Sequence, residues 1–149
     1  MRISDNGIKF IKRFEGVRFK PYRDVIGLYT VGCGHLIGDG KQLPDSWNKT
    51  FTEREVDALL KHDLLRFETG LSRLLPNVSL KQNEYDALIS FSFNLGLGTL
   101  QRSTIRQALL RNDKKLAAQS ILKYCYAGGK IIKGLQTRRL AEHNLFLGV

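Results

Sequence analysis

The chain has 149 residues, of which 42% are hydrophobic and 26% are charged, so it can bury a core and is not a disordered tail. Basic residues outnumber acidic ones by 24 to 14, and the net charge of +10 favours nucleic acid, anionic lipid or an acidic polymer as a partner. No apolar run approaches the ~20 residues of a membrane-spanning helix, and the polar residues 1–7 contain no export signal.

The chain is expected to begin with an amphipathic helix. Ser4 or Asp5 is a suitable N-cap. A glycine commonly ends a helix, so this one should end at Glu15 and Gly16. Its apolar positions recur at spacings of three and four: Ile8, Phe10, Ile11 and Phe14.

A small sheet and a loop follow. Residues 17–37 are rich in strand-forming types and are interrupted by proline and glycine, which indicates two or three antiparallel strands. Residues 38–40 read as a turn. Residues 38–51 read as a polar loop with an aromatic anchor at Trp47.

Two capping boxes predict the next two helices. Thr52 followed by Glu55 opens a helix over about 52–75, and Ser79 followed by Gln82 opens another. The first of these helices is long for a chain of this size and should bury the apolar positions Val56, Leu60, Leu64, Phe67, Leu71 and Leu74.

Shorter helices are expected in the last third of the chain. The second capped helix should end near Gly96, and Ser103 and Asp113 are plausible N-caps for two more. The pair at 128–129 breaks the chain, and 135–147 reads as a final helix.

This order of elements predicts an α+β fold that is mainly α. We expect one domain over residues 1–149, with an N-terminal lobe at about 1–51 and a connecting helix at about 52–75. A C-terminal helical lobe should occupy about 76–149, which holds 11 of the 24 basic residues and 4 of the 14 acidic ones.

Three residues in the first thirty suggest chemistry. Glu15 ends the first helix, and Asp24 and Thr30 lie at equal distances from Gly27. If Gly27 is the centre of a hairpin with a three-residue loop, Asp24 and Thr30 become cross-strand neighbours on one face. One protonated carboxyl, one ionised carboxylate and a hydroxyl that holds water suit hydrolysis of a glycosidic bond.

Other interpretations of the same segment exist. Most acidic residues are solvated surface charges, and these two have basic neighbours with which to pair: Lys12, Arg13, Arg18, Lys20 and Arg23. Cys33 and His35 suggest a thiol nucleophile. Two cysteines are too few for a disulfide framework, so Cys33 and Cys125 are otherwise expected to be reduced and partly buried. The dispersed histidines have no zinc-ligand spacing.

Three blocks of residues form a recognisable pattern in order along the chain. The first block is Phe14-Glu15-Gly16, Pro21-Tyr22-Arg23-Asp24, Gly27 and Tyr29 to His35; the second is Gln82, Asp86-Ala87-Leu88, Ser90-Phe91 and Phe93 to Gly96; the third is Ala127-Gly128-Gly129, Gly134-Leu135 and Arg138 to Glu142. Together these blocks resemble phage-type (T4-like) lysozymes of glycoside hydrolase family 24, and the pattern is most similar to that of endolysins of lambdoid and related enteric phages.

The resemblance implies a lysozyme-like fold and an inverting muramidase. Its substrate would be the β-1,4 bond between N-acetylmuramic acid and N-acetylglucosamine in peptidoglycan. Glu15 would be the general acid, and Asp24 and Thr30 would hold the attacking water. Leu36 and Phe93 would line the substrate site, with Ser103 as a sugar hydrogen-bonding group that has a competing N-cap role. The resemblance implies no cofactor and no metal.

Two rival functions remain open. A lytic transglycosylase cuts the same bond with one acid and leaves a 1,6-anhydro end. A basic nucleic-acid-binding protein would also explain the charge, although no nucleic-acid motif is present. We expect peptidoglycan as the partner, no nucleic acid, no stable membrane insertion and a monomer. The polar start of the chain suggests an endolysin held in the host cytoplasm until a holin releases it to cause lysis.

Overall fold

The computed structural model describes residues 1–149, and its internal contacts divide the chain into two compact units. We call residues Ile8–Leu65 the N-terminal unit. The C-terminal unit comprises Met1–Gly7 and Arg66–Val149. Helices α1 (Asp5–Glu15) and α2 (Glu53–Leu74) contribute residues to both. No helix combines the length and the apolar character needed to cross a membrane.

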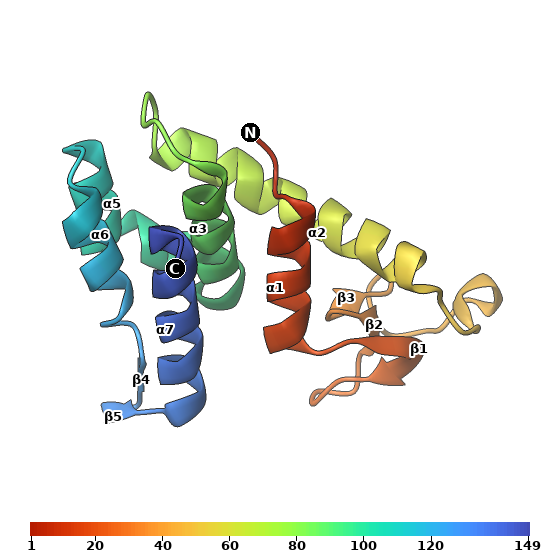
Figure 1. Cartoon of the computed structure of the whole chain (residues 1–149). Helices are drawn as coiled ribbons and strands as arrows, with labels where there is room; N and C mark the ends of the chain where they lie inside the picture. Colours follow the sequence, from red (N-terminus) through yellow and green to blue (C-terminus); the bar gives the residue numbers. More distant parts are fainter. The chain divides into compact units, whose positions relative to one another are not determined.

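The N-terminal unit contains a three-stranded antiparallel sheet in the order β1-β2-β3, joined to the end of α1 (Figure 1). The prediction of two or three strands is therefore confirmed. The elements are β1 (Arg18–Arg23), β2 (Tyr29–Gly32), β3 (His35–Leu36) and the short 3-10 helix η1 (Asp45–Trp47).

The ends of α1 follow from local chemistry, as predicted. Ser4 is the N-cap, since its Oγ accepts a hydrogen bond from the backbone N–H of Gly7 at 3.0 Å. Gly16 ends the helix with φ +77°, and its N–H donates to the carbonyl of Lys12 at 2.9 Å. A left-handed residue after the last turn is the usual helix stop, and glycine adopts it without steric cost.

Polar contacts tie α2 to the rest of the N-terminal unit. Lys12 Nζ binds Glu53 Oε1 at 3.0 Å and Asp57 Oδ1 at 2.7 Å. The His35 Nδ1 atom lies 2.9 Å from Asp63 Oδ2. Trp47 stacks on the His35 ring with centroids 5.7 Å apart, so the predicted anchor of the polar loop is confirmed.

Helix α2 has the predicted start and the predicted buried stripe. The Thr52 N–H donates to Glu55 Oε1 at 3.0 Å, and the Glu55 N–H donates to Thr52 Oγ1 at 3.1 Å, which is a reciprocal capping box. The six apolar positions expected to be buried are all at most 6% exposed: Val56, Leu60, Leu64, Phe67, Leu71 and Leu74.

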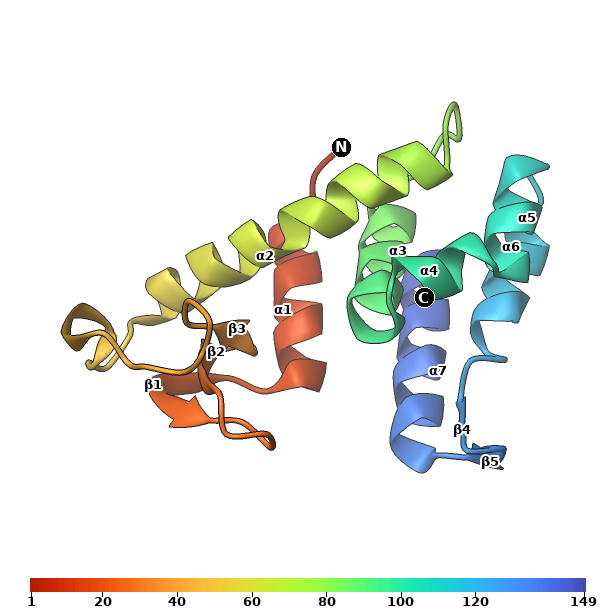
Figure 2. The ribbon, with the colours of Figure 1, turned by 180° about the vertical axis from the view of Figure 1, so that it is seen from behind.

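The C-terminal unit is helical (Figure 2), and α3 and α7 pack side by side while α5 packs on α6. Ser103 and Asp113 cap α5 and α6 as predicted. The helices are α3 (Gln82–Leu95), α4 (Leu97–Gln101), α5 (Thr104–Leu110), α6 (Lys114–Ile121) and α7 (Lys133–Leu147). The α+β, mainly α class is confirmed.

One prediction for this unit was wrong in detail. Helix α3 begins at Gln82 rather than after Ser79, because the Glu84 carboxylate accepts the Lys81 N–H at 2.8 Å and fixes the start there. The pair 128–129 interrupts the helical chain as predicted. It forms the turn of a small hairpin, β4 (Tyr126–Ala127) and β5 (Lys130–Ile131), with both glycines at positive φ.

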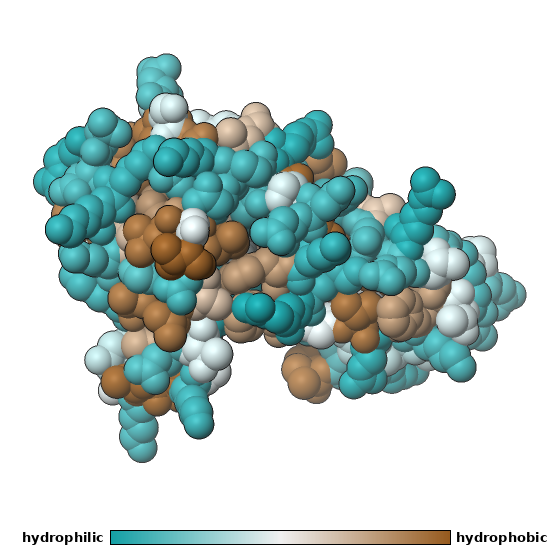
Figure 3. Space-filling model, in the orientation of Figure 1, coloured by the Kyte–Doolittle hydropathy of each residue, from teal (hydrophilic) through white to brown (hydrophobic).

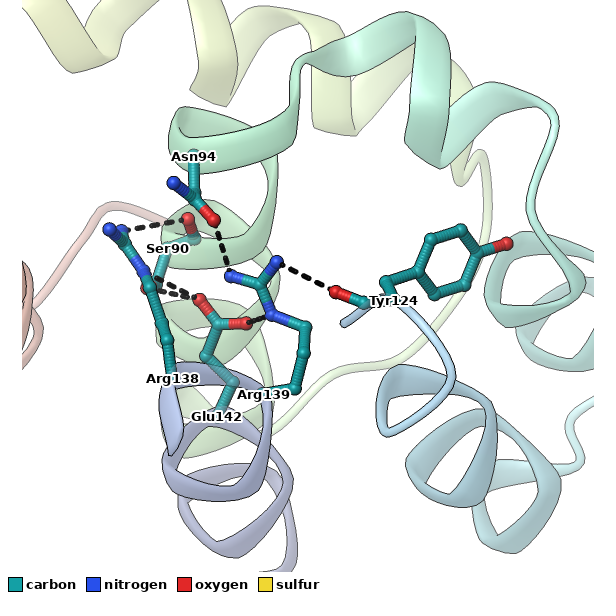
Figure 4. A network of polar contacts seen from close by, with 6 residues as sticks. All are labelled: Ser90, Asn94, Tyr124, Arg138, Arg139 and Glu142. Atoms are coloured by element: carbon teal, nitrogen blue, oxygen red, sulfur yellow. Dashed lines mark hydrogen bonds and ion pairs between the residues drawn. The ribbon is translucent and has the colours of Figure 1, made fainter. Parts of the chain in front are cut away.

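A buried ionic network joins α3 to α7 (Figure 4). Glu142 Oε1 accepts from Arg139 Nε at 2.7 Å, and Glu142 Oε2 accepts from Ser90 Oγ at 2.6 Å and from Arg138 Nε at 3.3 Å. Arg139 Nη2 also donates to Asn94 Oδ1 at 2.8 Å. Arg139 and Glu142 are fully buried, so neither charge has water as an alternative partner. Burial raises the pKa of Glu142, although the guanidinium groups of Arg138 and Arg139 act to lower it.

Candidate functional site

The β1–β2 hairpin differs by one residue from the predicted register. Tyr22 lies opposite Thr30, and Arg23 lies opposite Tyr29, so Asp24 and Thr30 are not cross-strand neighbours. Residues 24–28 lie between the two strands, and the hydrogen bond from the Asp24 N–H to the Leu28 carbonyl closes a three-residue turn, 25–27. Gly27 is the last residue of this turn and not its centre. The Gly27 N–H donates to the Asp24 carbonyl at 2.9 Å, and Gly27 has φ +85°. A turn followed by a left-handed glycine is the usual form of a three-residue hairpin loop.

Asp24 nonetheless lies in a defined position at the base of the loop. Its Oδ1 accepts hydrogen bonds from the Ile26 N–H at 3.0 Å and from the Leu28 N–H at 2.8 Å. Its own N–H donates to the Leu28 carbonyl at 2.9 Å. Two backbone donors on one oxygen stabilise a negative charge, and Asp24 Oδ2 makes no hydrogen bond within the chain.

Thr30 is hydrogen-bonded to the backbone of Leu28, the residue that also binds Asp24. It lies on β2 and is 4% exposed. Its Oγ1 donates to the Leu28 carbonyl at 2.9 Å. The backbone of Leu28 therefore orients both Asp24 and Thr30, which the structure brings together by a different route from the one predicted.

Glu15 is the last residue of α1, and its side chain is exposed. Strand β1 begins three residues later, at Arg18. The helix stop at Gly16 thus places a carboxyl group at the entry to the sheet. All three candidate catalytic residues belong to the N-terminal unit.

The remaining candidate site residues differ in their surroundings. Leu36 lies opposite Thr30 in the sheet and is 43% exposed, so it presents apolar surface on the face of Thr30. Phe93, in the C-terminal unit, packs edge to face on Phe67 with centroids 5.4 Å apart. Ser103 is 1% exposed. Its Oγ donates to the Leu100 carbonyl and accepts from the Arg106 N–H, so the structure gives it the capping role.

Tyr22 is a neighbour of the site that the sequence analysis missed. It lies opposite Thr30 on β1, on the same face of the sheet as Thr30 and Leu36. Finding it required the correct hairpin register, which the symmetry about Gly27 did not supply.

A thiol nucleophile at Cys33 is contradicted. Cys33 is 5% exposed and lies in the turn between β2 and β3, and burial raises the pKa of its thiol to about 11. The thiolate is the nucleophile, and this thiol remains protonated at neutral pH. The Nδ1 atom of His35 is already bound to Asp63. Both cysteines are free and buried, as expected.

The basic residues of this segment have partners that the sequence analysis did not anticipate. Arg13 lies 4.7 Å from the Phe14 ring centroid, Arg18 lies 4.7 Å from that of Tyr22, and Arg23 lies 4.5 Å from that of Tyr29. These are cation–π distances. The structure places no group of three or more His, Cys, Asp or Glu side chains where they could hold a metal ion.

The phage lysozyme family model matches residues 12–142, which include every candidate site residue. The endolysin of Salmonella phage P22 is 40% identical over 148 residues, covering 99% of each chain. The endolysin of Bacillus phage B103 is also 40% identical, over 99% of this chain, but the chain spans only 54% of that protein's length. A protein of bacteriophage PS119 named SAR-endolysin is 39% identical over 133 residues, which is 89% of this chain and 76% of that protein.

Solved structures show the same similarity to phage lysozymes. A variant of P22 lysozyme superimposes with a TM-score of 0.86 at 38% identity, covering 99% of each chain. The muramidase domain of SpmX from Asticaccaulis excentricus superimposes with a TM-score of 0.81 at 30% identity, covering 98% of this chain and 97% of that domain.

Proposed function

Because the chain belongs to the phage lysozyme family, we propose that it is an endolysin that hydrolyses peptidoglycan during host cell lysis. The bond cut is the β-1,4 linkage between N-acetylmuramic acid and N-acetylglucosamine, and the reaction inverts the anomeric centre. The observation that best supports this is the convergence of Asp24 and Thr30 on Leu28, on the hairpin that follows a helix ending in Glu15.

In this mechanism Glu15 donates a proton to the glycosidic oxygen. An exposed carboxyl at a helix end can reach a bound glycan, and protonation of the leaving group is the role of the acid in an inverting glycosidase. The two carboxyl groups of such enzymes are usually ~6.5–9.5 Å apart, which leaves room for a water molecule.

Asp24 and Thr30 hold that water. The hydroxyl of Thr30 has one proton, and it donates that proton in a hydrogen bond to the Leu28 carbonyl. Thr30 Oγ1 can therefore only accept a hydrogen bond from the water. Asp24 Oδ2 accepts a hydrogen bond from the second proton of the same water and takes that proton as the water oxygen bonds to the sugar carbon. With both protons bound, a lone pair of the water is directed at the sugar carbon. Leu36 and Phe93 are proposed to contact the sugar rings.

The first test is Glu15→Gln, which retains the size and polarity of the side chain but cannot donate a proton. We expect the rate of hydrolysis of purified peptidoglycan to fall by at least ~10²-fold with an unchanged unfolding transition. Glu53→Gln, whose side chain is 72% exposed in the same unit, is the matched control and should retain the wild-type rate. A Glu15→Gln protein that keeps a tenth of that rate would refute the assignment.

The remaining parts of the proposal concern organisation and location. The two units are proposed as the two lobes of the enzyme, with α2 connecting them, and the enzyme is proposed to act as a monomer. Accumulation in the host cytoplasm and release through a holin are tested by fractionation with and without holin co-expression. Cell-wall degradation that needs no holin would contradict this route.

A further inference from the structure

The C-terminal unit carries a basic segment that the proposed hydrolysis does not use. Between Lys114 and Ala141 there are seven basic residues and no acidic one. Some of these charges are neutralised by residues outside the segment. Lys114 Nζ binds Glu84 at 2.8 Å, and Arg138 and Arg139 bind Glu142. Four exposed lysines, which form no ion pair, remain: Lys115, Lys123, Lys130 and Lys133.

Three of these lysines surround an apolar hairpin. We call residues 122–133, which contain β4 and β5, the hairpin surface. It holds four of the fourteen exposed large hydrophobic side chains of the protein: Leu122 at 37%, Tyr126 at 59%, Ile131 at 52% and Ile132 at 41%. An exposed hydrophobic patch on a soluble domain marks an interaction site when its members are contiguous.

The strand register places two of these four side chains, Tyr126 and Ile131, on one face of the hairpin. Tyr126 pairs with Ile131 across the hairpin, so their side chains lie side by side. Cys125, one residue before Tyr126, is buried at 5%. Since side chains alternate along a strand, the face that carries Tyr126 and Ile131 is directed away from the core and into solvent.

The fold presents this surface at the end of two helices. β4 and β5 connect the C-terminal end of α6 to the N-terminal end of α7 (Figures 1 and 2). Figure 3 shows hydrophobic side chains at this end of the unit, with long hydrophilic side chains extending beyond them. The exposed apolar side chains of the hairpin surface thus have the exposed lysines Lys123, Lys130 and Lys133 as neighbours along the chain.

We propose that the hairpin surface binds the surface of an anionic phospholipid bilayer. Lysines attract the anionic headgroups, and the aromatic and aliphatic side chains enter the boundary between headgroups and acyl chains. A hydrated acidic polymer, such as nucleic acid or the glycan itself, would satisfy the lysines but would leave Tyr126 and Ile131 without an apolar phase. The presence of both kinds of side chain on one hairpin therefore favours lipid.

The test is co-sedimentation of the full chain with vesicles of phosphatidylcholine alone and of equal parts phosphatidylcholine and phosphatidylglycerol. Binding is expected only to the anionic vesicles. Lys130→Gln together with Lys133→Gln should weaken it by about fivefold per lysine, the usual contribution of a basic residue at such a surface. Ile131→Ser should weaken it by about tenfold, since a half-exposed aliphatic side chain no longer enters the bilayer.

Matched control variants remove exposed lysine and aliphatic side chains that lie outside the hairpin surface. Lys9→Gln with Lys41→Gln removes two exposed lysines, and Leu110→Ser removes a side chain that is 46% exposed on α5. Neither should change vesicle binding. All variants should digest lipid-free peptidoglycan at the wild-type rate, so a failure of lipid binding is separable from a failure of the proposed hydrolysis.

Entry of the hairpin into the bilayer has its own readout. With Trp47 replaced by Phe, Tyr126→Trp places the only tryptophan of the chain on the hairpin surface. Its emission should shift to shorter wavelength on anionic vesicles. No binding, binding that is insensitive to Ile131→Ser, no emission shift, or hairpin variants that lose retention on peptidoglycan alone would each overturn the proposal.

Discussion

Leu28 orients the proposed water-binding pair without using its side chain. Its N–H binds Asp24 Oδ1, and its carbonyl accepts from the Thr30 hydroxyl and from the Asp24 N–H. Backbone groups fixed in a hairpin hold their partners in one geometry, as a preorganised site requires. The identity of residue 28 matters less to this arrangement than the shape of the loop.

Thr30→Val tests whether the Thr30 hydroxyl binds the attacking water. Valine has nearly the same shape and a high strand propensity, so the sheet should be retained. Removing one acceptor of a neutral hydrogen bond costs ~0.5–1.5 kcal/mol, which corresponds to a fall in rate of roughly 2- to 13-fold. Initial rates of wall hydrolysis measure this. Thr50→Val, at an exposed loop position, should leave them unchanged, and an equally active Thr30→Val protein would make Thr30 purely structural.

The buried thiol of Cys33 predicts slow chemical modification. Because burial raises its pKa to about 11, little thiolate exists at pH 8, and a thiol reagent should react far more slowly with native Cys125→Ala protein than with the same protein in denaturant. In the unfolded chain the Cys33 thiol ionises near pH 9. The part of the unfolding free energy that depends on a protonated Cys33 is therefore fully present below that pH. It is lost as the pH rises toward 11. Rapid labelling at pH 8 would contradict this environment.

The helices whose ends depend on local chemistry were predictable from the sequence. Ser4, Thr52, Ser103 and Asp113 each accept a backbone hydrogen bond two or three residues ahead, and a short polar side chain before an apolar run is sufficient to indicate this. The three candidate catalytic residues were chosen on a different basis, the resemblance of their spacing and neighbours to a known family, and their roles stay predictions.

The start of α3 and the hairpin register were not predictable in the same way. The Gln82 amide does not reach back to Ser79 but donates to the Arg2 carbonyl and to Asp86 Oδ1, and the first of these partners is 80 residues away. In the hairpin, a left-handed glycine ends a three-residue loop instead of centring it. Symmetry about Gly27 therefore gave the right loop length with the wrong partner for Thr30.

The α3–α7 network predicts a large effect from one buried charge. Glu142→Gln leaves Arg139, which is fully buried, without its carboxylate partner. Breaking a buried ion pair costs about 3–5 kcal/mol of unfolding free energy. Denaturant unfolding of this variant should show it. Glu53→Gln, which breaks an exposed ion pair with Lys12, should cost at most ~1 kcal/mol. Equal losses in the two variants would contradict the buried environment of Glu142.

At the scale of the whole molecule, the chain passes between its two units inside helices. Met1–Gly7 belongs to the C-terminal unit, where the Ile3 N–H binds Glu68 Oε2 at 2.8 Å and the Ser4 N–H binds Asp86 Oδ1 at 3.1 Å. Partners 65 and 82 residues apart leave no local signal in the sequence. The helix that begins at this anchor ends at Glu15, the proposed acid.

The charge of the whole chain has two uses in this account. The net charge of +10 favours adsorption to an anionic cell wall, and this attraction is screened by salt. Three exposed lysines that form no ion pair belong to the hairpin surface and serve the proposed lipid contact: Lys123, Lys130 and Lys133. Neither use requires nucleic acid, for which the chain offers no recognition motif.

If this chain hydrolyses the glycan with an added water, the chemical structure of the digestion products will show it. Purified, lipid-free peptidoglycan digested to completion should give fragments that end in a reducing N-acetylmuramic acid, each one water heavier than a 1,6-anhydro product by mass spectrometry. The newly formed end should have the inverted anomeric configuration when it is observed early in the reaction. Fragments that end in 1,6-anhydromuramic acid would contradict the account, because a transglycosylase needs no water held by Asp24 and Thr30.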